Sequence, residues 1–78
     1  MKILSNNERF IVQESNTPEW YLITDKVNLV SLKFKIHDFN NSQQVIFLEN
    51  SNLDVIQAAR IMREMADYMF ANHYDLIF

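Results

Sequence analysis

The segment Ser51–Asn72 is the one long stretch of this chain in which apolar residues recur with the period of an α-helix. At about 100° per residue, its apolar stripe consists of Val55, Ala58, Ala59, Met62, Met65, Ala66 and Met69. Alanine allows a neighbouring backbone to approach closely, and methionine fills irregular gaps between side chains. Such a stripe is typical of a helix that lies on a β-sheet, so the rest of the chain must supply the sheet.

Capping residues predict where this helix begins and ends. Ser51 and Asp54 have the spacing of a capping box, and the Asp54 carboxylate falls where the helix dipole favours a negative charge. We therefore expect the helix to begin near residue 52. Asn72 tolerates the left-handed conformation that often ends a helix, which places the end near residue 72.

The segments before the helix show the alternation of β-strands. The clearest is 29–38, where Val30, Leu32, Phe34 and Ile36 alternate with Ser31, Lys33, Lys35 and His37. Further strands are predicted at 8–14, 19–24 and 43–49, and residues 1–4 are a candidate edge strand. The pair Asn40-Asn41 predicts a tight turn before the last strand, and Asn50 leads from that strand into the helix.

Strands followed by one helix predict an α+β fold in a single domain that spans residues 1–78. We expect an antiparallel four- to five-stranded β-meander followed by one C-terminal α-helix packed on one sheet face, in the order ββββα. The apolar row of segment 29–38 should then meet the helix at Met62, Met65 and Met69.

The composition excludes several classes of functional site. The chain has no glycine, which phosphate-binding loops, dinucleotide fingerprints and nucleophile elbows all require. Its turns should instead use asparagine and aspartate at positive φ. Cysteine is also absent, which excludes disulfides, thiolate catalysis and cysteine metal sites. A net charge of −3 argues against general nucleic-acid binding.

Neither a membrane span nor a secretion signal is expected. No apolar run approaches the roughly 18 residues that a span requires. The N-terminal sequence MKILSNNERF also lacks the apolar region of a signal peptide. We therefore expect a soluble, cytoplasmic protein.

Two histidines lie beside acidic residues, at His37-Asp38 and at His73 and Asp75, and invite an acid–base or metal-binding interpretation. Their spacing matches no metal motif, because ligands must converge in space and these lie in distant segments. A serine hydrolase would need a glycine elbow to present its serine. We expect no catalytic, cofactor or metal residues, and we do not expect an enzyme.

A basic row offers an alternative function. Lys33, Lys35 and His37 should stand on one strand face at about 6.8 Å intervals, near aromatic residues such as Trp20 and Tyr21. Basic and aromatic side chains on a sheet hold single-stranded RNA or DNA in several small modules. The other interpretation is a solvated outer face that prevents aggregation.

The end of the helix and the tail after it form the predicted partner-binding surface. Its residues are Ile61, Tyr68, Phe70, Tyr74, Leu76, Ile77 and Phe78. The apolar arc of the helix is wider than one sheet face can easily cover, and the chain ends on three apolar residues. These residues either pack within the monomer or bind a partner. A homodimer through this surface is the simplest closed assembly.

The chain resembles the small inhibitor proteins of phages and mobile elements, including some anti-CRISPR proteins. The resemblance rests on size, acidity, the absence of cysteine and glycine, and the order of strands followed by one helix. It implies a non-enzymatic protein that occupies a surface of a larger host protein, in the host cytoplasm if the chain is phage-encoded. It assigns no role to any particular residue.

Overall fold

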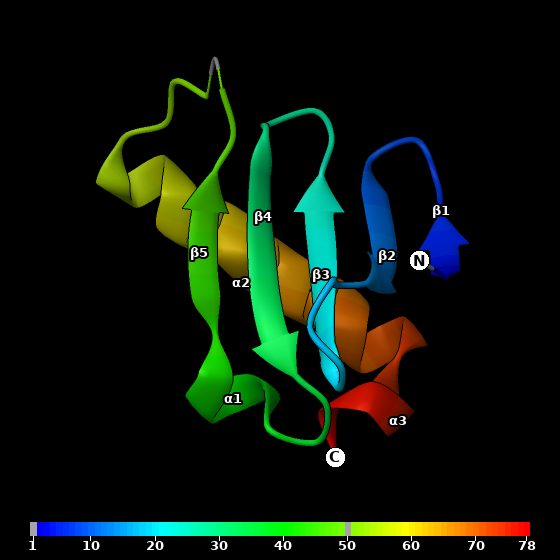
Figure 1. The fold of residues 1–78 in the computed structure, drawn as a ribbon. Helices are drawn as coiled ribbons and strands as arrows, with labels where there is room; N and C mark the ends of the chain where they lie inside the picture. Colours follow the sequence, from blue (N-terminus) through cyan, green and yellow to red (C-terminus); the bar gives the residue numbers. More distant parts are fainter. Residues whose placement is uncertain (1, 50) are drawn as a thin grey trace.

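The computed structural model describes residues 2–49 and 51–78, and within them it shows an α+β fold with five strands. The strands are β1 (Ile3–Asn6), β2 (Phe10–Glu14), β3 (Trp20–Asp25), β4 (Val30–Lys35) and β5 (Gln44–Phe47). They form one antiparallel sheet in chain order, from β1 at one edge to β5 at the other (Figure 1). The helices are α1 (Phe39–Ser42), α2 (Val55–Asn72) and α3 (Tyr74–Ile77). The predicted fold, a β-meander followed by a helix, is confirmed.

Alternation along the strands gives the sheet a core face and an outer face. In the register of β3 and β4, Ile23 lies opposite Leu32 and Leu22 lies opposite Lys33. Directly opposed residues of an antiparallel pair share a face. Ile23 and Leu32 are fully buried on the core face, whereas Lys33 lies on the outer face.

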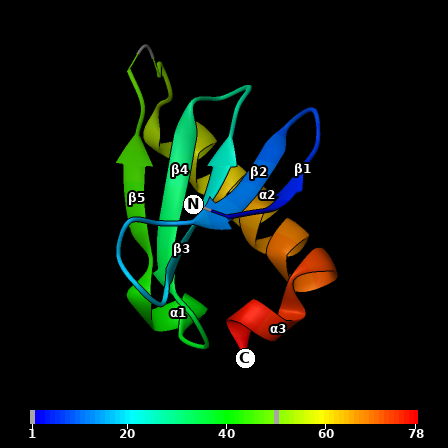
Figure 2. The same cartoon turned by 45° about the vertical axis from the view of Figure 1, so that its right-hand side comes forward.

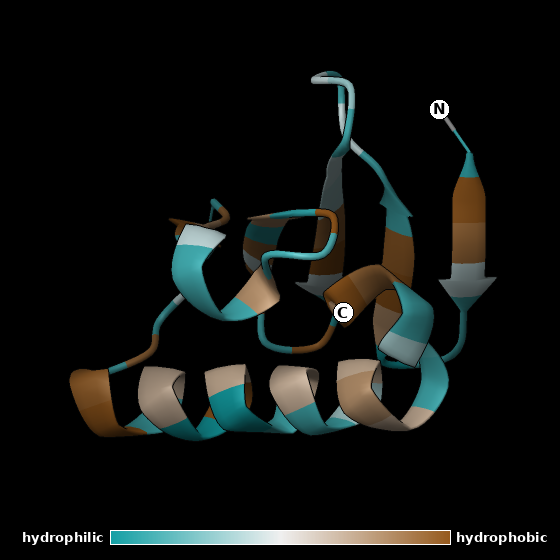
Figure 3. Cartoon of the chain, turned by 90° about the horizontal axis from the view of Figure 1, so that it is seen from below, coloured by the Kyte–Doolittle hydropathy of each residue, from teal (hydrophilic) through white to brown (hydrophobic). Residues whose placement is uncertain are grey.

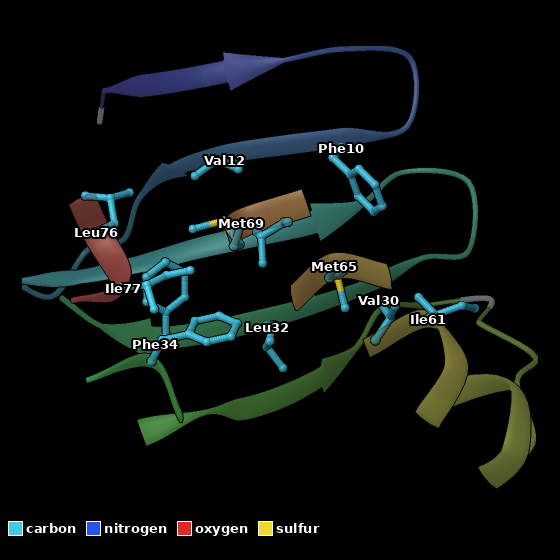
Figure 4. Packing of buried hydrophobic residues seen from close by; sticks show 12 residues of the cluster. Phe10, Val12, Val30, Leu32, Phe34, Ile61, Met65, Met69, Leu76 and Ile77 are labelled. Carbon is cyan, nitrogen blue, oxygen red and sulfur yellow. The ribbon is translucent and has the colours of Figure 1, made fainter. Parts of the chain in front are cut away.

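Helix α2 crosses the core face diagonally, from the β5 side of the sheet to the β1–β2 side (Figures 1 and 2). Viewed from below, it forms a second layer beneath the strands (Figure 3). Met65 and Met69 point from the helix toward the sheet (Figure 4). The buried core consists of Phe10, Val12, Ile23, Val30, Leu32, Phe34, Phe39, Ile61, Met65, Met69, Leu76 and Ile77.

Helix α2 begins at Val55, so the predicted start near residue 52 is wrong. The capping box is formed by Asp54 and Gln57. The Asp54 carboxylate accepts from the Gln57 N–H at 2.8 Å, and the Gln57 side chain accepts from the Asp54 N–H at 3.2 Å. Ser51 instead donates to the carbonyl of Asn28 at 3.4 Å, which ties this loop to the sheet. The chain needs these extra residues to cross from β5 to the other layer.

The predicted end of the helix at Asn72 is confirmed, but its capping is different. Asn72 is helical, and its side-chain amide donates to the carbonyl of Tyr68 at 3.0 Å. His73 is the C-cap, with a φ of −137° rather than a left-handed conformation. The chain turns there directly into α3, so the tail is a short helix whose Leu76 and Ile77 are buried.

The β4–β5 connection also differs from the prediction. Strand β4 ends at Lys35, and residues 39–42 form α1 where a tight turn at Asn40-Asn41 was expected. Phe39 is 1% exposed and packs edge-on against Phe34, with 5.0 Å between ring centroids. Burial of this ring explains the short helix. Met1, in the candidate edge strand, and Asn50, predicted to lead into the helix, lie outside the described residues.

Three residues of the described chain have positive φ: Glu19 at 71°, Leu29 at 60° and His37 at 63°. The prediction that asparagine and aspartate would occupy such positions is therefore wrong. Glu19 and Leu29 directly precede β3 and β4, and His37 lies two residues after the end of β4, so all three stand in connections whose geometry sets the conformation. A residue with a Cβ atom costs roughly 1–2 kcal/mol there, which the hydrogen bonds and packing of the sheet must offset.

The buried face of α2 is rotated relative to the predicted stripe. Ile61 is 3% exposed at the centre of the buried face, whereas Val55 is 85% and Ile56 is 82% exposed. Ala59, another member of the predicted stripe, is also exposed. Val55 and Ile56 are exposed because the first turn of α2 extends past β5 and has no sheet beneath it (Figures 1 and 3).

Two isoleucines of α2 give a matched test of this rotation. Ile61→Ala should lower the free energy of unfolding by about 2–5 kcal/mol, because it removes buried methyl groups and leaves a cavity. Ile56→Ala should change it by less than about 0.5 kcal/mol in a dilute, monomeric sample, because its side chain is in solvent in the single chain. Urea denaturation followed by circular dichroism measures both values. Equal losses in the two variants would contradict the observed helix orientation.

Candidate functional site

An exposed aromatic patch, formed by Phe70, Tyr74 and Phe78, lies at the C-terminal end of the molecule. The Phe78 ring centroid is 4.9 Å from that of Tyr74 and 5.7 Å from that of Phe70. Their exposed fractions are 38% for Phe70, 61% for Tyr74 and 58% for Phe78. Phe70 also packs edge-on against the buried Phe39, with 6.3 Å between centroids. The patch is thus continuous with the core.

Helix α3 holds two of these rings in place. Its buried residues Leu76 and Ile77 anchor it to the core (Figure 4), and it lies near α1 (Figure 2). The Leu76 carbonyl accepts from the His37 N–H at 2.8 Å, and the Phe78 N–H donates to the Tyr74 carbonyl at 3.2 Å. The hydrogen bond between His37 and Leu76 therefore holds the turn after β4 against α3.

Of the seven residues of the predicted partner-binding surface, three are buried, one is half-buried and three are exposed. Ile61, Leu76 and Ile77 are buried in the core and are not available for contact with a partner. Tyr68 is half-buried, and its ring lies 4.9 Å from that of Phe10 on β2. The remaining three residues form the aromatic patch. More of the apolar arc of α2 is buried than the sequence indicated, because β2 and α3 supply additional packing partners.

The predicted basic row retains two of its three members. Lys33 and Lys35 lie on the outer face of β4, but the strand ends at Lys35. His37 is exposed in the following turn, outside the strand, so its inclusion in the row is wrong. The ammonium group of Lys33 lies 5.6 Å from the centroid of the Trp20 ring.

The aromatic residues predicted near this row separate onto two faces. Trp20 lies opposite Lys35 on the outer face, and Tyr21 lies opposite Phe34 on the core face. Tyr21 stacks on Phe34 with 6.1 Å between ring centroids. One aromatic ring of the predicted pair therefore accompanies the lysines.

A polar cluster of Ser5, Tyr68 and His73 joins the first strand to the end of α2. Ser5 Oγ lies 2.8 Å from His73 Nε2 and 3.1 Å from the Tyr68 hydroxyl. A serine–imidazole contact of this length occurs in nucleophile–base pairs. Within the described residues, however, His73 makes no hydrogen bond to a carboxylate that could orient it. The contact fastens β1 to the helix, and no sequence pattern indicates it because 68 positions separate the two residues.

Asp25 is a fully buried carboxylate on the core face. It accepts four hydrogen bonds, from the Val27 and Asn28 N–H groups, the Asn28 side chain and Arg9 Nε. Burial alone raises the pKa of Asp25, but these hydrogen bonds and the Arg9 charge together lower it. Arg9 also pairs with Glu64 of α2 and so links the sheet to the helix. Every acceptor site of Asp25 is thus used in holding the fold.

Within 2–49 and 51–78, no pocket is found and no group of three or more potential ligands could hold a metal ion. No helix in the same ranges is long and apolar enough to cross a membrane.

Protonation of His73 should weaken the fold. Burial lowers the pKa of His73, and the neighbouring Asp75 opposes this only in part. The unfolded chain then binds more protons than the folded one as pH falls through the ordinary histidine value of about 6.5. Stability should therefore decrease from about pH 7.5 to 5.5, and less so in His73→Gln. Urea denaturation at both pH values measures the difference, and equal losses would contradict the prediction.

No family model, no curated protein and no solved structure matches the chain.

Proposed function

We propose that the protein is a non-enzymatic protein-interaction module that binds a surface of a larger host protein and thereby inhibits or regulates it. It is a small inhibitor of the kind made by phages and mobile elements, and it acts in the cytoplasm of the host. The observation that carries this proposal is the exposed aromatic patch of Phe70, Tyr74 and Phe78.

The aromatic patch has the properties of a binding hot spot. Aromatic side chains dominate the energetic centres of protein interfaces because they remove a large area from water in one contact. The three rings also contact one another before any partner arrives, and buried residues hold their helices in place. Binding through such a preformed group loses less side-chain entropy than binding through mobile side chains.

Substitution of the patch should remove partner binding without unfolding the protein. We expect the double variant Tyr74→Ser/Phe78→Ser to bind at least about 30-fold more weakly, which corresponds to roughly 2 kcal/mol. The matched control is Val27→Ser, since Val27 is 68% exposed in the turn between β3 and β4, far from α3 (Figure 1).

The measurement starts with affinity capture from host lysate and mass spectrometry, followed by calorimetric titration of the captured protein. The wild type and the Val27→Ser variant should bind alike. If the double variant retains wild-type affinity for that protein, the aromatic patch is not the binding surface. Melting curves of all three proteins show that each is folded.

The outer face of the sheet supports a second candidate function, the binding of single-stranded RNA or DNA. The contact between Lys33 and Trp20 places a cation and an aromatic ring side by side, and Lys35 is exposed opposite Trp20. Bases stack on such rings while lysines contact phosphates. The net charge of −3 weighs against strong binding, so this candidate ranks second.

Salt dependence tests the second candidate. If both lysines contact phosphates, the plot of log affinity against log salt should have a slope near −1.4, or about −0.7 per phosphate on a single strand. Lys33→Glu/Lys35→Glu should abolish binding to a labelled oligonucleotide in fluorescence anisotropy. Lys26→Glu, the same charge change in an exposed turn residue, should weaken it far less. Absence of binding at low salt would remove this candidate.

A further inference from the structure

The edge strand β5 is apolar on both faces and remains exposed. All four of its residues are exposed. The exposed fractions are 37% for Val45, 40% for Ile46 and 55% for Phe47. The strand carries no charged residue, no proline and no bulge. Proteins usually protect a sheet edge with one of these features, because an open edge pairs with other strands.

The opposite edge of the sheet is protected. The pairing of β1 with β2 is interrupted by a register shift between Ile3 and Ser5, and β1 ends on the polar residues Ser5 and Asn6. Ser5 is also held by His73 and Tyr68. Of the two edges, β5 is therefore the one suited to pair with another strand.

The backbone groups that face away from β4 can be identified. The Leu48 N–H donates to the Leu29 carbonyl at 2.9 Å, so this pair is hydrogen-bonded across β4 and β5. Hydrogen-bonded pairs alternate along an antiparallel ladder. Ile46 and Gln44 therefore bond to β4, whereas the N–H and C=O groups of Val45 and Phe47 point to the free edge. Outside the sheet ladder, no hydrogen bond of the described chain involves Val45 or Phe47.

A second apolar surface adjoins this edge. The first turn of α2 extends past β5 on the core side of the sheet (Figures 1 and 3), and it carries the highly exposed Val55 and Ile56. Val45 and Phe47 also lie on the core side, because they pair with Leu32 and Val30. We call the whole surface the β5 patch, which consists of Val45, Ile46, Phe47, Leu48, Val55 and Ile56.

We propose that a second copy of this chain binds the β5 patch, so that two β5 strands pair antiparallel about a two-fold axis and the two sheets become one ten-stranded sheet. A free edge of unpaired N–H and C=O groups is complementary to another strand edge. In a dimer with two-fold symmetry, the same surface of each copy forms the interface. Two identical strands that pair antiparallel are related by such a two-fold axis.

One register pairs Val45, Ile46 and Phe47 only with one another, with Gln44 opposite Leu48 as the one mixed pair beside them. With the axis at Ile46, Val45 bonds to Phe47 of the other copy, Phe47 bonds to its Val45, and the two Ile46 side chains meet on the outer face. Glu49 then lies opposite Gln43 rather than opposite an apolar residue. A shift of the axis to Phe47 would place Glu49 against Val45, and a shift to Val45 would place Ile46 against Gln44.

The exposed area of the β5 patch fits a dimer interface. With full areas of roughly 150–200 Å² for residues of these sizes, the exposed fractions of the six residues leave on the order of 500–650 Å² in water. A standard interface buries about 800 Å² per partner, so the patch supplies most of it before the backbone edge is counted. The two-fold axis is perpendicular to the sheet, which keeps both α2 helices on one face and brings their first turns toward the partner.

This placement differs from the homodimer predicted through the end of α2. The aromatic patch offers rings but no unpaired strand edge, and its role in the proposed function is to contact a different protein. The dimer leaves both aromatic patches free, because α3 lies at the other end of α2 from the β5 patch (Figure 1). Each dimer could then hold two copies of the host protein.

Sedimentation equilibrium gives the first test. We expect a mass of twice 9.3 kDa at high concentration and dissociation on dilution. Ile46→Lys should remain monomeric, because it places two like charges together at the axis. The matched control is Ile3→Lys, which introduces the same charge on the other edge strand at a residue that is 52% exposed, and it should remain dimeric. A monomeric wild type at every concentration up to about 1 mM would overturn the proposal.

A proline variant and hydrogen exchange test the strand pairing itself. Val45→Pro removes an N–H that points to the free edge and no N–H of the β4–β5 ladder. It should be monomeric, with a melting temperature close to that of a monomeric wild-type sample. In the wild type, the Val45 and Phe47 amides should exchange more slowly as concentration rises. A dimer that persists in both Val45→Pro and Ile46→Lys, or that leaves these amides unprotected, would place the interface elsewhere.

Discussion

The structure depends on one helix covering one face of a five-stranded sheet. Strands are spaced about 4.8 Å apart, so five strands form a surface much wider than the roughly 10 Å diameter of a helix. Helix α2 compensates by crossing the sheet diagonally, which brings its buried residues over several strands in turn. The core forms between α2 and the sheet where the two cross. The exposed surfaces at both ends of the helix are the parts of the molecule that the helix leaves uncovered.

At the C-terminal end of α2, the uncovered space is filled by the chain itself. Helix α3 buries Leu76 and Ile77 against the core, and α1 buries Phe39 from the other side. Phe70 and Phe78 lie at the margin of this packing and remain in contact with water. The aromatic patch is therefore the outer part of the same packing that completes the core. For that reason its rings are held in place although they are exposed.

At the N-terminal end of α2, nothing in the described chain fills the corresponding space. The first turn extends past β5, and Val55 and Ile56 are left almost fully exposed there. The β5 patch combines this apolar turn with an unpaired strand edge. The two ends of one diagonal helix thus give the molecule two different surfaces, one suited to aromatic contact and one suited to strand pairing.

Polar contacts between distant segments keep this small fold in register. Arg9 bonds both the buried Asp25 and Glu64, which joins the β1–β2 connection, the end of β3 and α2. Ser5 joins β1 to His73 and Tyr68 at the end of α2. In both cases the residues are of common charged or polar types. Their structural role depends on contacts between segments that are distant in the sequence.

The sequence by itself determined the strands, the long helix and the fold class, but not the short helices α1 and α3. Alternation in segments such as 29–38 and the helical period of 51–72 depend on neighbours a few positions apart, so they can be recognised without the structure. The tertiary structure decided which apolar residues are buried. Ile61 rather than Val55 faces the core because the helix crosses at an angle, and β5 is exposed because the helix leaves its edge uncovered. The seven predicted partner residues separate into core and surface for the same reason, since burial depends on which distant segments meet.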